Sequence, residues 1–371
     1  MTTDSIVAET ATRLFRDHCD PQAVIAARGD GWKADAWSAI EAAGLPLAWV
    51  PDDLGGAGAD IADGFAVLRE TGRFAIALPV AETLLAGWLL SRAGVAAPAG
   101  AMACGPARDG DHLTVARDGP LSGRLRGIAF GKEAKHFAVL AMREGGGSAV
   151  ALLSAEGLRI SDGAGPAGDP LDTIVLDRVR PLAMEDTRLD GGTLLLMGAA
   201  VRSMQMAGAL EAILDISVRY ANERVAFGKP IAKFQAVQHN LARLAGETAA
   251  ALAAAGSAAD AIAGQSSSGF PPPRNPPRKG EGNRSANDDA LFLEIASAKI
   301  RVGEAAGEGA AIAHQVLGAI GYTREHILHR FTQRLWAWRD DFGNESQWAV
   351  KLGHRVAANG ADALWPMLAA R

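Results

Sequence analysis

The hydrophobic period of this sequence changes twice along its 371 residues, and no other feature limits the possible folds as much. Up to about residue 100, apolar residues recur at the three- and four-residue spacing of amphipathic helices. Between 101 and 183 they form short runs separated by Gly, Pro and Asp, which is typical of a small antiparallel β domain. Helical spacing then returns in longer segments. The sequence therefore predicts a mainly α fold with an N-terminal helical domain (1–100), a middle antiparallel β domain (101–183) and a C-terminal helical bundle (184–371).

Several short segments carry these patterns. The apolar runs of the middle part predict strands at 113–115, 127–130, 136–141, 148–153 and 173–176. In the last part, Ile231, Phe234, Val237, Leu241 and Leu244 share one face of a helix. Further helices are predicted from about 291 to 318, 326 to 338 and 346 to 368. Four or five long helices joined in this way favour a bundle.

One segment, 264–287, interrupts the bundle pattern. It is rich in Pro, Gly, Ser and charge, and such a composition cannot supply the apolar surface of a core. We expect a disordered insertion between two bundle helices, because a long surface loop costs little stability.

The junction around Arg224-Val225-Ala226-Phe227-Gly228-Lys229-Pro230 predicts a helix–turn–helix. Gly228 is suited to end the first helix in the left-handed conformation, and Pro230 is suited to the first position of the second. Arg224 would then lie in the last turn of one helix and Gln235 in the second turn of the next. A guanidinium there could bind a phosphate through two parallel hydrogen bonds. An ordinary helical hairpin with a solvated arginine would give the same sequence pattern.

Composition excludes several classes of protein. The formal net charge of −5 has no clustered basic excess, which argues against nucleic-acid binding. Cys19 and Cys104 are the only cysteines, and no Cys/His cluster suggests a metal site, so we expect reduced cysteines that serve packing. The first 17 residues mix charges with apolar residues, unlike a signal peptide, and no stretch approaches an uncharged span of membrane length. These features predict a cytoplasmic protein.

Two motifs resemble those of the acyl-CoA dehydrogenase family. Glu223-Arg224-x-x-Phe227-Gly228, continued by Phe234-Gln235, is similar to the family's Arg-x-x-Phe-Gly signature. Gln315-Val-Leu-Gly318-Ala319-Ile320-Gly321-Tyr322 is similar to its Gln-x-x-Gly-Gly-x-Gly-Tyr motif, with Ala319 in place of the second glycine. The Gly-rich turn from Pro51 to Gly58, which by itself reads as a connector, is similar to a third family turn.

This resemblance implies a cofactor and partners. Arg224 would contact the pyrophosphate of FAD, and Phe227 and Gln235 would flank its adenosine half. Gln315, Gly318 and Gly321 would hold the same end from a neighbouring subunit, where glycine allows the backbone to approach a phosphate. The implied substrate is an acyl-CoA, the implied electron acceptor is an electron-transfer flavoprotein or a similar protein, and the implied assembly is a homo- or hetero-tetramer.

The catalytic base of the family has no counterpart at its usual positions. The reaction removes an α-proton, which requires a desolvated carboxylate, while a hydride passes from the β-carbon to the flavin. Where most members carry this glutamate, the sequence has Phe342 or Gly343, and where others carry it, the sequence has Gly198. Asp341 and Glu345 are the nearby carboxylates, but acidic residues also favour the start of the last helix through its dipole.

The family's segments around the flavin ring are also altered. Residues 103–107 and 130–132 stand roughly where the family has its Thr-Glu-Pro loop and its Trp-Ile-Thr strand. One hypothesis is a base-lacking subunit of a hetero-oligomeric acyl-CoA dehydrogenase, acting on bulky or ring-bearing acyl-CoAs. The alternatives are a flavin oxidase or monooxygenase of the same fold, and a non-catalytic helical scaffold.

Overall fold

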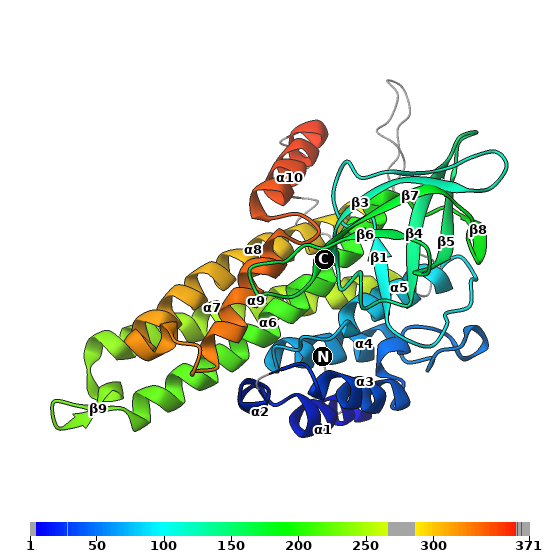
Figure 1. Cartoon of the computed structure of the whole chain (residues 1–371). Helices are drawn as coiled ribbons and strands as arrows, with labels where there is room; N and C mark the ends of the chain where they lie inside the picture. Colours follow the sequence, from blue (N-terminus) through cyan, green and yellow to red (C-terminus); the bar gives the residue numbers. More distant parts are fainter. Residues whose placement is uncertain (1–4, 28, 266–285, 361, 363–364, 366–371) are drawn as a thin grey trace.

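A computed structural model describes residues 5–27, 29–265, 286–360, 362 and 365, in the arrangement shown in Figure 1. Helices form the N-terminal part, a β sheet lies beside them, and long helices extend away from the sheet as a bundle. The predicted fold class, mainly α with a small middle β domain, is confirmed. Most of the segment predicted as a disordered insertion, 266–285, lies outside the described residues.

The N-terminal part is helical throughout. Its elements are α1 (Ile6–Cys19), α2 (Pro21–Ala26), α3 (Trp32–Ala42), the short helices η1 (Leu45–Leu47) and η2 (Asp52–Leu54), α4 (Ile61–Arg73) and α5 (Val80–Ser91). Helix α5 packs against the sheet and against α6, and all of its residues except Ser91 are buried. Because α5 has almost no exposed face, its sequence is apolar on every side apart from Glu82 and Thr83.

The middle part forms one eight-stranded sheet. Its strands are β1 (Met102–Gly105), β2 (Leu113–Val115), β3 (Leu121–Ala129), β4 (His136–Arg143), β5 (Ser148–Ser154), β6 (Arg159–Ser161), β7 (Leu171–Val179) and β8 (Ala183–Thr187). The order is β6-β7-β3-β2-β4-β5-β8, with β1 paired to β4. The sheet is antiparallel as predicted, except that β4 pairs in parallel with both β1 and β2.

The C-terminal part contains α6 (Gly191–Glu223), α7 (Gln235–Gln265), α8 (Ala286–Leu317), η4 (Gly318–Tyr322), α9 (Leu328–Asp340) and α10 (Glu345–Asn359). Helix α6 packs against α4, α7, α8 and α9 and is the central helix. Its crossing with α4 is close: a β-carbon at Gly208 would lie 2.0 Å from the carbonyl oxygen of Arg69. Helix α10 ends at Asn359, where Gly360 follows with φ of 82°, and most of the remainder of the predicted helix 346–368 lies outside the described residues.

The expectation that no uncharged stretch approaches membrane length is compatible with α6, which carries Arg202 and Glu211. Among the described helices, α6 is long and apolar enough to cross a membrane, but 94% of its most apolar window is buried inside the protein. Its composition reflects its position, since a helix surrounded by four others has little surface to expose to water.

The junction after α6 also differs from the prediction. Gly228 does not end a helix; α6 ends at Glu223, and Arg224 is already extended. Strands β9 (Val225–Ala226) and β10 (Lys229–Pro230) form a hairpin whose two turn residues, Phe227 and Gly228, both have positive φ. This is the geometry that joins two twisted strands tightly. A short helix η3 (Ile231–Lys233) follows, so that Gln235 begins α7 instead of lying in its second turn.

Candidate functional site

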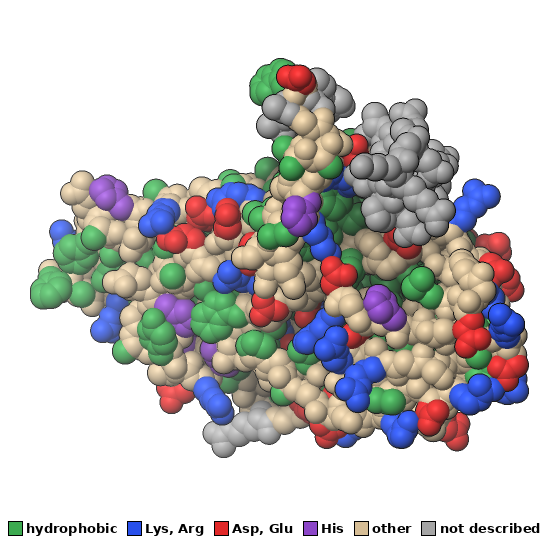
Figure 2. Space-filling view, turned by 90° about the horizontal axis from the view of Figure 1, so that it is seen from above, with side chains coloured by type: hydrophobic (Ala, Val, Ile, Leu, Met, Phe, Trp, Pro, Cys, Tyr) green, Lys and Arg blue, Asp and Glu red, His purple; other side chains and the backbone are tan. Residues whose placement is uncertain are grey.

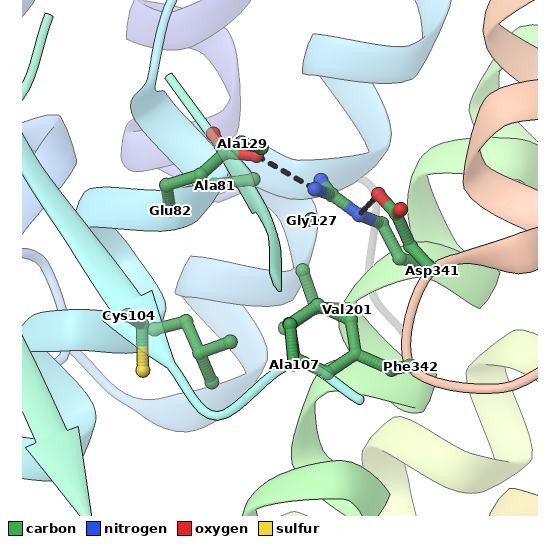
Figure 3. Close-up of a pocket in the computed structure, with 11 residues that line it drawn as sticks. Ala81, Glu82, Cys104, Ala107, Gly127, Ala129, Val201, Asp341 and Phe342 are labelled. Atoms are coloured by element: carbon green, nitrogen blue, oxygen red, sulfur yellow. Dashed lines mark hydrogen bonds and ion pairs between the residues drawn. The ribbon is translucent and has the colours of Figure 1, made fainter. Parts of the chain in front are cut away.

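A small cavity lies where α5, the sheet, α6 and the segment after α9 meet. Figure 3 shows the side chains around it. Its lining residues are Ala81, Glu82, Leu85, Cys104, Ala107, Gly127, Ala129, Val201, Arg202, Asp341 and Phe342. All three parts of the chain therefore contribute to the wall of one site.

Arg202 is the centre of a buried ion network in this wall. Its Nη2 donates to Oε1 of Glu82 at 2.7 Å, and its Nε donates to Oδ2 of Asp341 at 3.0 Å (Figure 3). Its Nη1 donates to Oε1 of Gln205 at 2.6 Å, and Gln205 in turn donates to the hydroxyl of Thr71. The guanidinium is thus held by α5, α6 and the segment after α9 at once, and only 3% of Arg202 is exposed.

The charges in this network depend on one another. Burial raises the pKa of Glu82, and the nearby Arg202 guanidinium opposes this rise. Burial lowers the pKa of Arg202, but the two carboxylates more than offset it, so that its pKa is raised. We therefore describe Arg202, Glu82 and Asp341 as an ion triad with one cation between two acidic groups.

The two positions at which the family carries its base meet in this structure. Gly198 of α6 faces the ring of Phe342, and a β-carbon at Gly198 would lie 2.2 Å from Cδ1 of that ring. Phe342 has a positive φ of 55°, and its carbonyl oxygen accepts a hydrogen bond from Nε1 of Trp348 at 3.0 Å. A phenyl ring is therefore packed directly on Gly198, and these are two of the positions at which the resemblance led us to expect a carboxylate.

The two carboxylates that the sequence suggested lie in different surroundings. Asp341 lines the cavity, but Arg202 already holds it in the ion triad. Glu345 accepts from Nε of Arg339 at 2.6 Å and packs on Gly303 of α8, and it does not line the cavity. Neither side chain is a free carboxylate beside open space, so the structure offers no support for either as the base.

Glu82 and Arg202 were not singled out from the sequence. Each is the lone charge in an otherwise apolar stretch, at 80–90 and 191–210 respectively. A charged residue is almost never fully buried unless it is paired, so two such residues in helices predicted to be buried could have been expected to meet.

Little space is left around the ion triad. The cavity of Figure 3 has a volume of about 20 Å³, enough for roughly one water molecule. A second cavity of about 130 Å³ shares Glu82, Ala129, Arg202 and Asp341 with it and continues toward Trp338 of α9. Pockets for cofactor-sized ligands are usually about 300–1,000 Å³, so this region does not fit a flavin ring in the present arrangement.

The other end of the bundle has an open surface instead. Arg224 and Phe227 of the hairpin are exposed, Phe227 to 95%, and Gln235 is exposed at the start of α7. The side chains of Arg224 and Gln235 form no hydrogen bond or ion pair with any residue that the structure describes. Their polar groups are therefore available to a ligand or to another chain.

The second motif lies at the same end of the bundle, because α8 runs antiparallel to α7. Gln315 and Gly318 are exposed, whereas Gly321 is buried. A β-carbon at Gly321 would lie 3.1 Å from Cβ of Leu317 and 3.4 Å from Nδ1 of His314. Gly321 therefore serves packing within this chain, and only Gln315 and Gly318 present a surface to a neighbour.

Exposed apolar side chains surround these polar groups. Tyr322 is 74% exposed and stacks on His314 with their ring centroids 4.4 Å apart, and Trp336 lies parallel to His314 on the same cluster. Val225 is 58% exposed on the hairpin. Figure 2 shows hydrophobic side chains gathered among the charges over the bundle. The residues that the resemblance assigns to the adenosine half of FAD thus lie on an open surface, whereas the space beside the ion triad is small. A larger cavity of about 440 Å³ lies between the sheet and the start of α6, lined by Pro106, Asp190 and Leu195 among others.

The contact between Gly198 and Phe342 leads to a prediction about stability. Alanine normally stabilises a helix interior by about 1 kcal/mol relative to glycine, but Gly198→Ala is expected to lower the free energy of unfolding by about 1–3 kcal/mol because its methyl group would overlap the ring. In a Phe342→Ala background the same change is expected to stabilise. Urea unfolding of the four variants measures both effects.

Gly246→Ala is the matched control, because Gly246 lies in α7 with nothing within 4 Å of the place where the new methyl group would stand. It is expected to stabilise in either background. A destabilising Gly198→Ala that persists without the Phe342 ring would contradict the contact.

Comparisons with known proteins agree with this architecture. The N-terminal domain of the acyl-CoA dehydrogenase family matches residues 2–97, and the C-terminal domain of that family matches residues 192–273. The acyl-CoA dehydrogenase IpdE2 of Mycobacterium tuberculosis (strain ATCC 25618 / H37Rv) is 28% identical over 335 residues, which cover 89% of each chain.

Two solved structures show the same fold. A chain of the ChsE4-ChsE5 complex from Mycobacterium tuberculosis is similar with a TM-score of 0.81 and 20% identity, over 97% of this chain and 99% of that chain. PigA with FAD and proline is similar with a TM-score of 0.77 and 17% identity, over 97% and 100% of the two chains.

Proposed function

Because this chain belongs to the acyl-CoA dehydrogenase family, FAD-dependent oxidoreductases that act on CH–CH groups, we propose that it is the base-lacking subunit of a hetero-oligomeric acyl-CoA dehydrogenase. Arg224, Phe227, Gln235, Gln315 and Gly318 contact the adenosine half of an FAD shared with a neighbouring chain. The neighbouring chain provides the ring pocket and the carboxylate. Gly321 supports this surface from within.

The observation that carries this proposal is the difference between the two ends of the bundle. At the hairpin end, Arg224 and Gln235 are exposed and have no partner among the described residues. At the sheet end, the Phe342 ring packs on Gly198, and the ion triad of Arg202 occupies the adjoining wall. A chain that carried out the whole reaction would need open space beside Phe342 and the ion triad.

The chemistry of the proposed complex follows from its cofactor. When bound, FAD accepts the hydride that leaves the β-carbon of an acyl-CoA. In the complex, Arg224 neutralises and orients a pyrophosphate oxygen, which a planar guanidinium can do through two parallel hydrogen bonds. Removal of the α-proton is assigned to the partner, because no carboxylate beside the Phe342 ring is free among the residues that the structure describes.

The substrate class and the acceptor are part of the proposal. ChsE4 and ChsE5 form a complex of two chains, and another structural neighbour is described as a steroid acyl-CoA dehydrogenase. We propose by analogy a bulky or ring-bearing acyl-CoA as substrate, a cytoplasmic location, a tetramer of two kinds of chain and an electron-transfer flavoprotein or a similar acceptor.

Expression of the chain alone and with its partner tests the proposal. The chain should be purified from its native cells with an affinity tag, and a second dehydrogenase-like chain is expected to accompany it. The complex is expected to show flavin absorbance and to reduce a dye with acyl-CoA, and the chain alone is expected to do neither. A yellow, active homo-oligomer would overturn the proposal. A chain that binds neither FAD nor a partner would favour a helical scaffold.

Arg224→Gln separates the cofactor contact from folding. In the purified complex the substitution is expected to weaken FAD binding about 10- to 100-fold, as the loss of a charge-assisted bond to phosphate usually does. The melting temperature of the chain alone is expected to stay unchanged, because the Arg224 side chain is exposed. FAD content after dialysis and a thermal melt measure the two effects.

Arg188→Gln is the matched control. Arg188 is also exposed, but it precedes α6, whereas Arg224 follows it. The 33 residues of the helix separate the two by roughly 50 Å. Equal FAD loss in both variants would show that Arg224 has no specific contact with the cofactor.

A further inference from the structure

A polar cavity of about 270 Å³ lies between the N-terminal helices, the loop before β7 and α9, and it adjoins the 130 Å³ cavity at Ala167, Asp169 and Pro170. Its polar lining residues are Asp30, Lys33, Asp169, His329, Arg330, Gln333 and Arg334. It does not include the ion triad of Arg202. It has room for a small organic molecule, since one water in the liquid takes about 30 Å³.

Two arginines of α9 line this cavity, and each has a buried donor without a partner among the described residues. Arg334 is 3% exposed; its Nη2 donates to Oδ1 of Asp169 at 2.6 Å, and its Nη1 donates to the carbonyl of Arg330 at 3.0 Å. Its Nε is buried and has no partner among the described residues. The Nε of Arg330 is buried without such a partner as well, and Nη2 of Arg330 makes a long contact of 3.4 Å with the carbonyl of Ala75.

The charges around the cavity leave Arg330 without a counter-ion. Lys33 pairs with Asp30 and with Glu133, each at 3.3 Å, and Asp169 pairs with Arg334. Among the described residues that line the cavity, Arg330 is then the cation that forms no ion pair. His329 adds little positive charge at neutral pH, because burial lowers its pKa.

Arg330 stays charged in this position. Burial, and after it the neighbouring Arg334, lower the pKa of Arg330 to about 10, which is still well above neutral pH. A largely desolvated cation without an ion pair is costly, and the more distant charge of Asp169 offsets that cost only in part for Arg330. An anion that entered the cavity would lower it.

We propose that this cavity is a binding site for a small oxyanion, a carboxylate or a phosphate group, held by the guanidinium of Arg330. A guanidinium group matches the planar geometry of both kinds of anion. Asp169 pairs with Arg334, so Arg330 is the guanidinium of this lining that has no ion pair with a described residue. The proposal does not depend on the function proposed above, since neither the adenosine surface nor Phe342 takes part.

Titration of the whole chain with inorganic phosphate and with succinate tests the site. At saturation, one of these anions is expected to raise the melting temperature by roughly 2–5 °C above that in chloride of equal ionic strength. A response to phosphate alone assigns a phosphoryl ligand, and a response to succinate alone assigns a carboxylate. No response to either anion beyond the chloride effect overturns the proposal, and an equal response in the variant below shows an adventitious ion only.

Arg330→Gln is expected to abolish the anion response, and Arg324→Gln, a change of an exposed arginine before α9, is expected to preserve it. Gln333→Glu is a second variant, which tests the site even if Arg330→Gln does not fold. Gln333 lines the cavity three residues from Arg330 on the same helix, so the new carboxylate lies within reach of that guanidinium. It is expected to raise the melting temperature without anion and to reduce the response to added anion. A full response in Gln333→Glu contradicts the proposed site.

Discussion

Arg202→Met is expected to lower the free energy of unfolding by about 3–5 kcal/mol, the usual cost of removing one partner of a buried ion pair. The effect is large because the substitution leaves Glu82 and Asp341 near each other without their shared cation. Glu82 would then have to take up a proton or remain charged in an apolar wall. Urea unfolding at neutral pH measures the loss.

The control distinguishes the buried triad from an ordinary surface pair. Arg143 and Asp186 also form an ion pair, at 2.5 Å, but Asp186 is 77% exposed. Arg143→Met is expected to cost at most about 1 kcal/mol. Replacing Glu82 and Asp341 by leucine together with Arg202→Met should recover much of the lost stability, because no charge of the triad then remains buried. A loss for Arg202→Met as small as that of the surface control would mean that the triad is accessible to water.

Stability is expected to rise with pH above neutrality because of Lys299. This lysine is 1% exposed, and its Nζ donates to the carbonyls of Trp338 at 2.6 Å and Arg339 at 2.9 Å, near the end of α9. Burial lowers its pKa from 10.5 to about 7, against the opposing charges of Asp341 and Glu345. Between these two pH values the unfolded chain binds more protons at this residue than the folded chain does.

The sign and size of the effect follow from proton linkage. A lysine whose pKa is lower in the folded state gives a free energy of unfolding that rises from about pH 7 toward 10.5, by at most about 1.4 kcal/mol per pH unit. Cys19 and Cys104 act in the opposite direction above about pH 9, because burial raises the pKa of both thiols. Urea unfolding between pH 7 and 8.5 therefore avoids the two thiols, and comparison with a variant at Lys299 separates its contribution from that of other groups.

Lys299→Met is expected to flatten the pH dependence in this range. The exposed Lys233→Met is the control, and it should keep the slope of the unmodified protein. If Lys299→Met and the unmodified protein show the same slope, the lysine is charged or solvated in the folded state, and its role at the end of α9 must be different.

The architecture followed from local patterns. Short apolar runs in the middle part are strands, and long apolar-striped segments are the bundle helices, because periods of 2 and 3.6 residues determine which side chains share a face. Local rules were less successful at the junction, where a type I′ hairpin replaced the expected helix end at Gly228. Both structures use a glycine with positive φ, so the sequence signal is the same for each.

The site depended much more on tertiary contacts. The family resemblance predicts that Arg224, Gln235 and Gln315 share one surface. It also predicts a base at Phe342 or Gly343, or at Gly198, where the sequence has no carboxylate. It could not show that the Phe342 ring packs on Gly198, or that Arg202 meets Glu82 of another part of the chain. Those contacts join residues more than 100 positions apart, and no local period encodes them.

By itself, therefore, the sequence determined the order of helical and β parts, the family motifs and the absence of a carboxylate at the two base positions. The tertiary structure alone decided that Asp341 is paired with Arg202, that Glu345 lies away from the cavity, and that Arg330 lines a cavity without an ion pair to a described residue. The physical reason is that a charge has a different energy in water and in a protein interior, and only the fold determines which of these surrounds it.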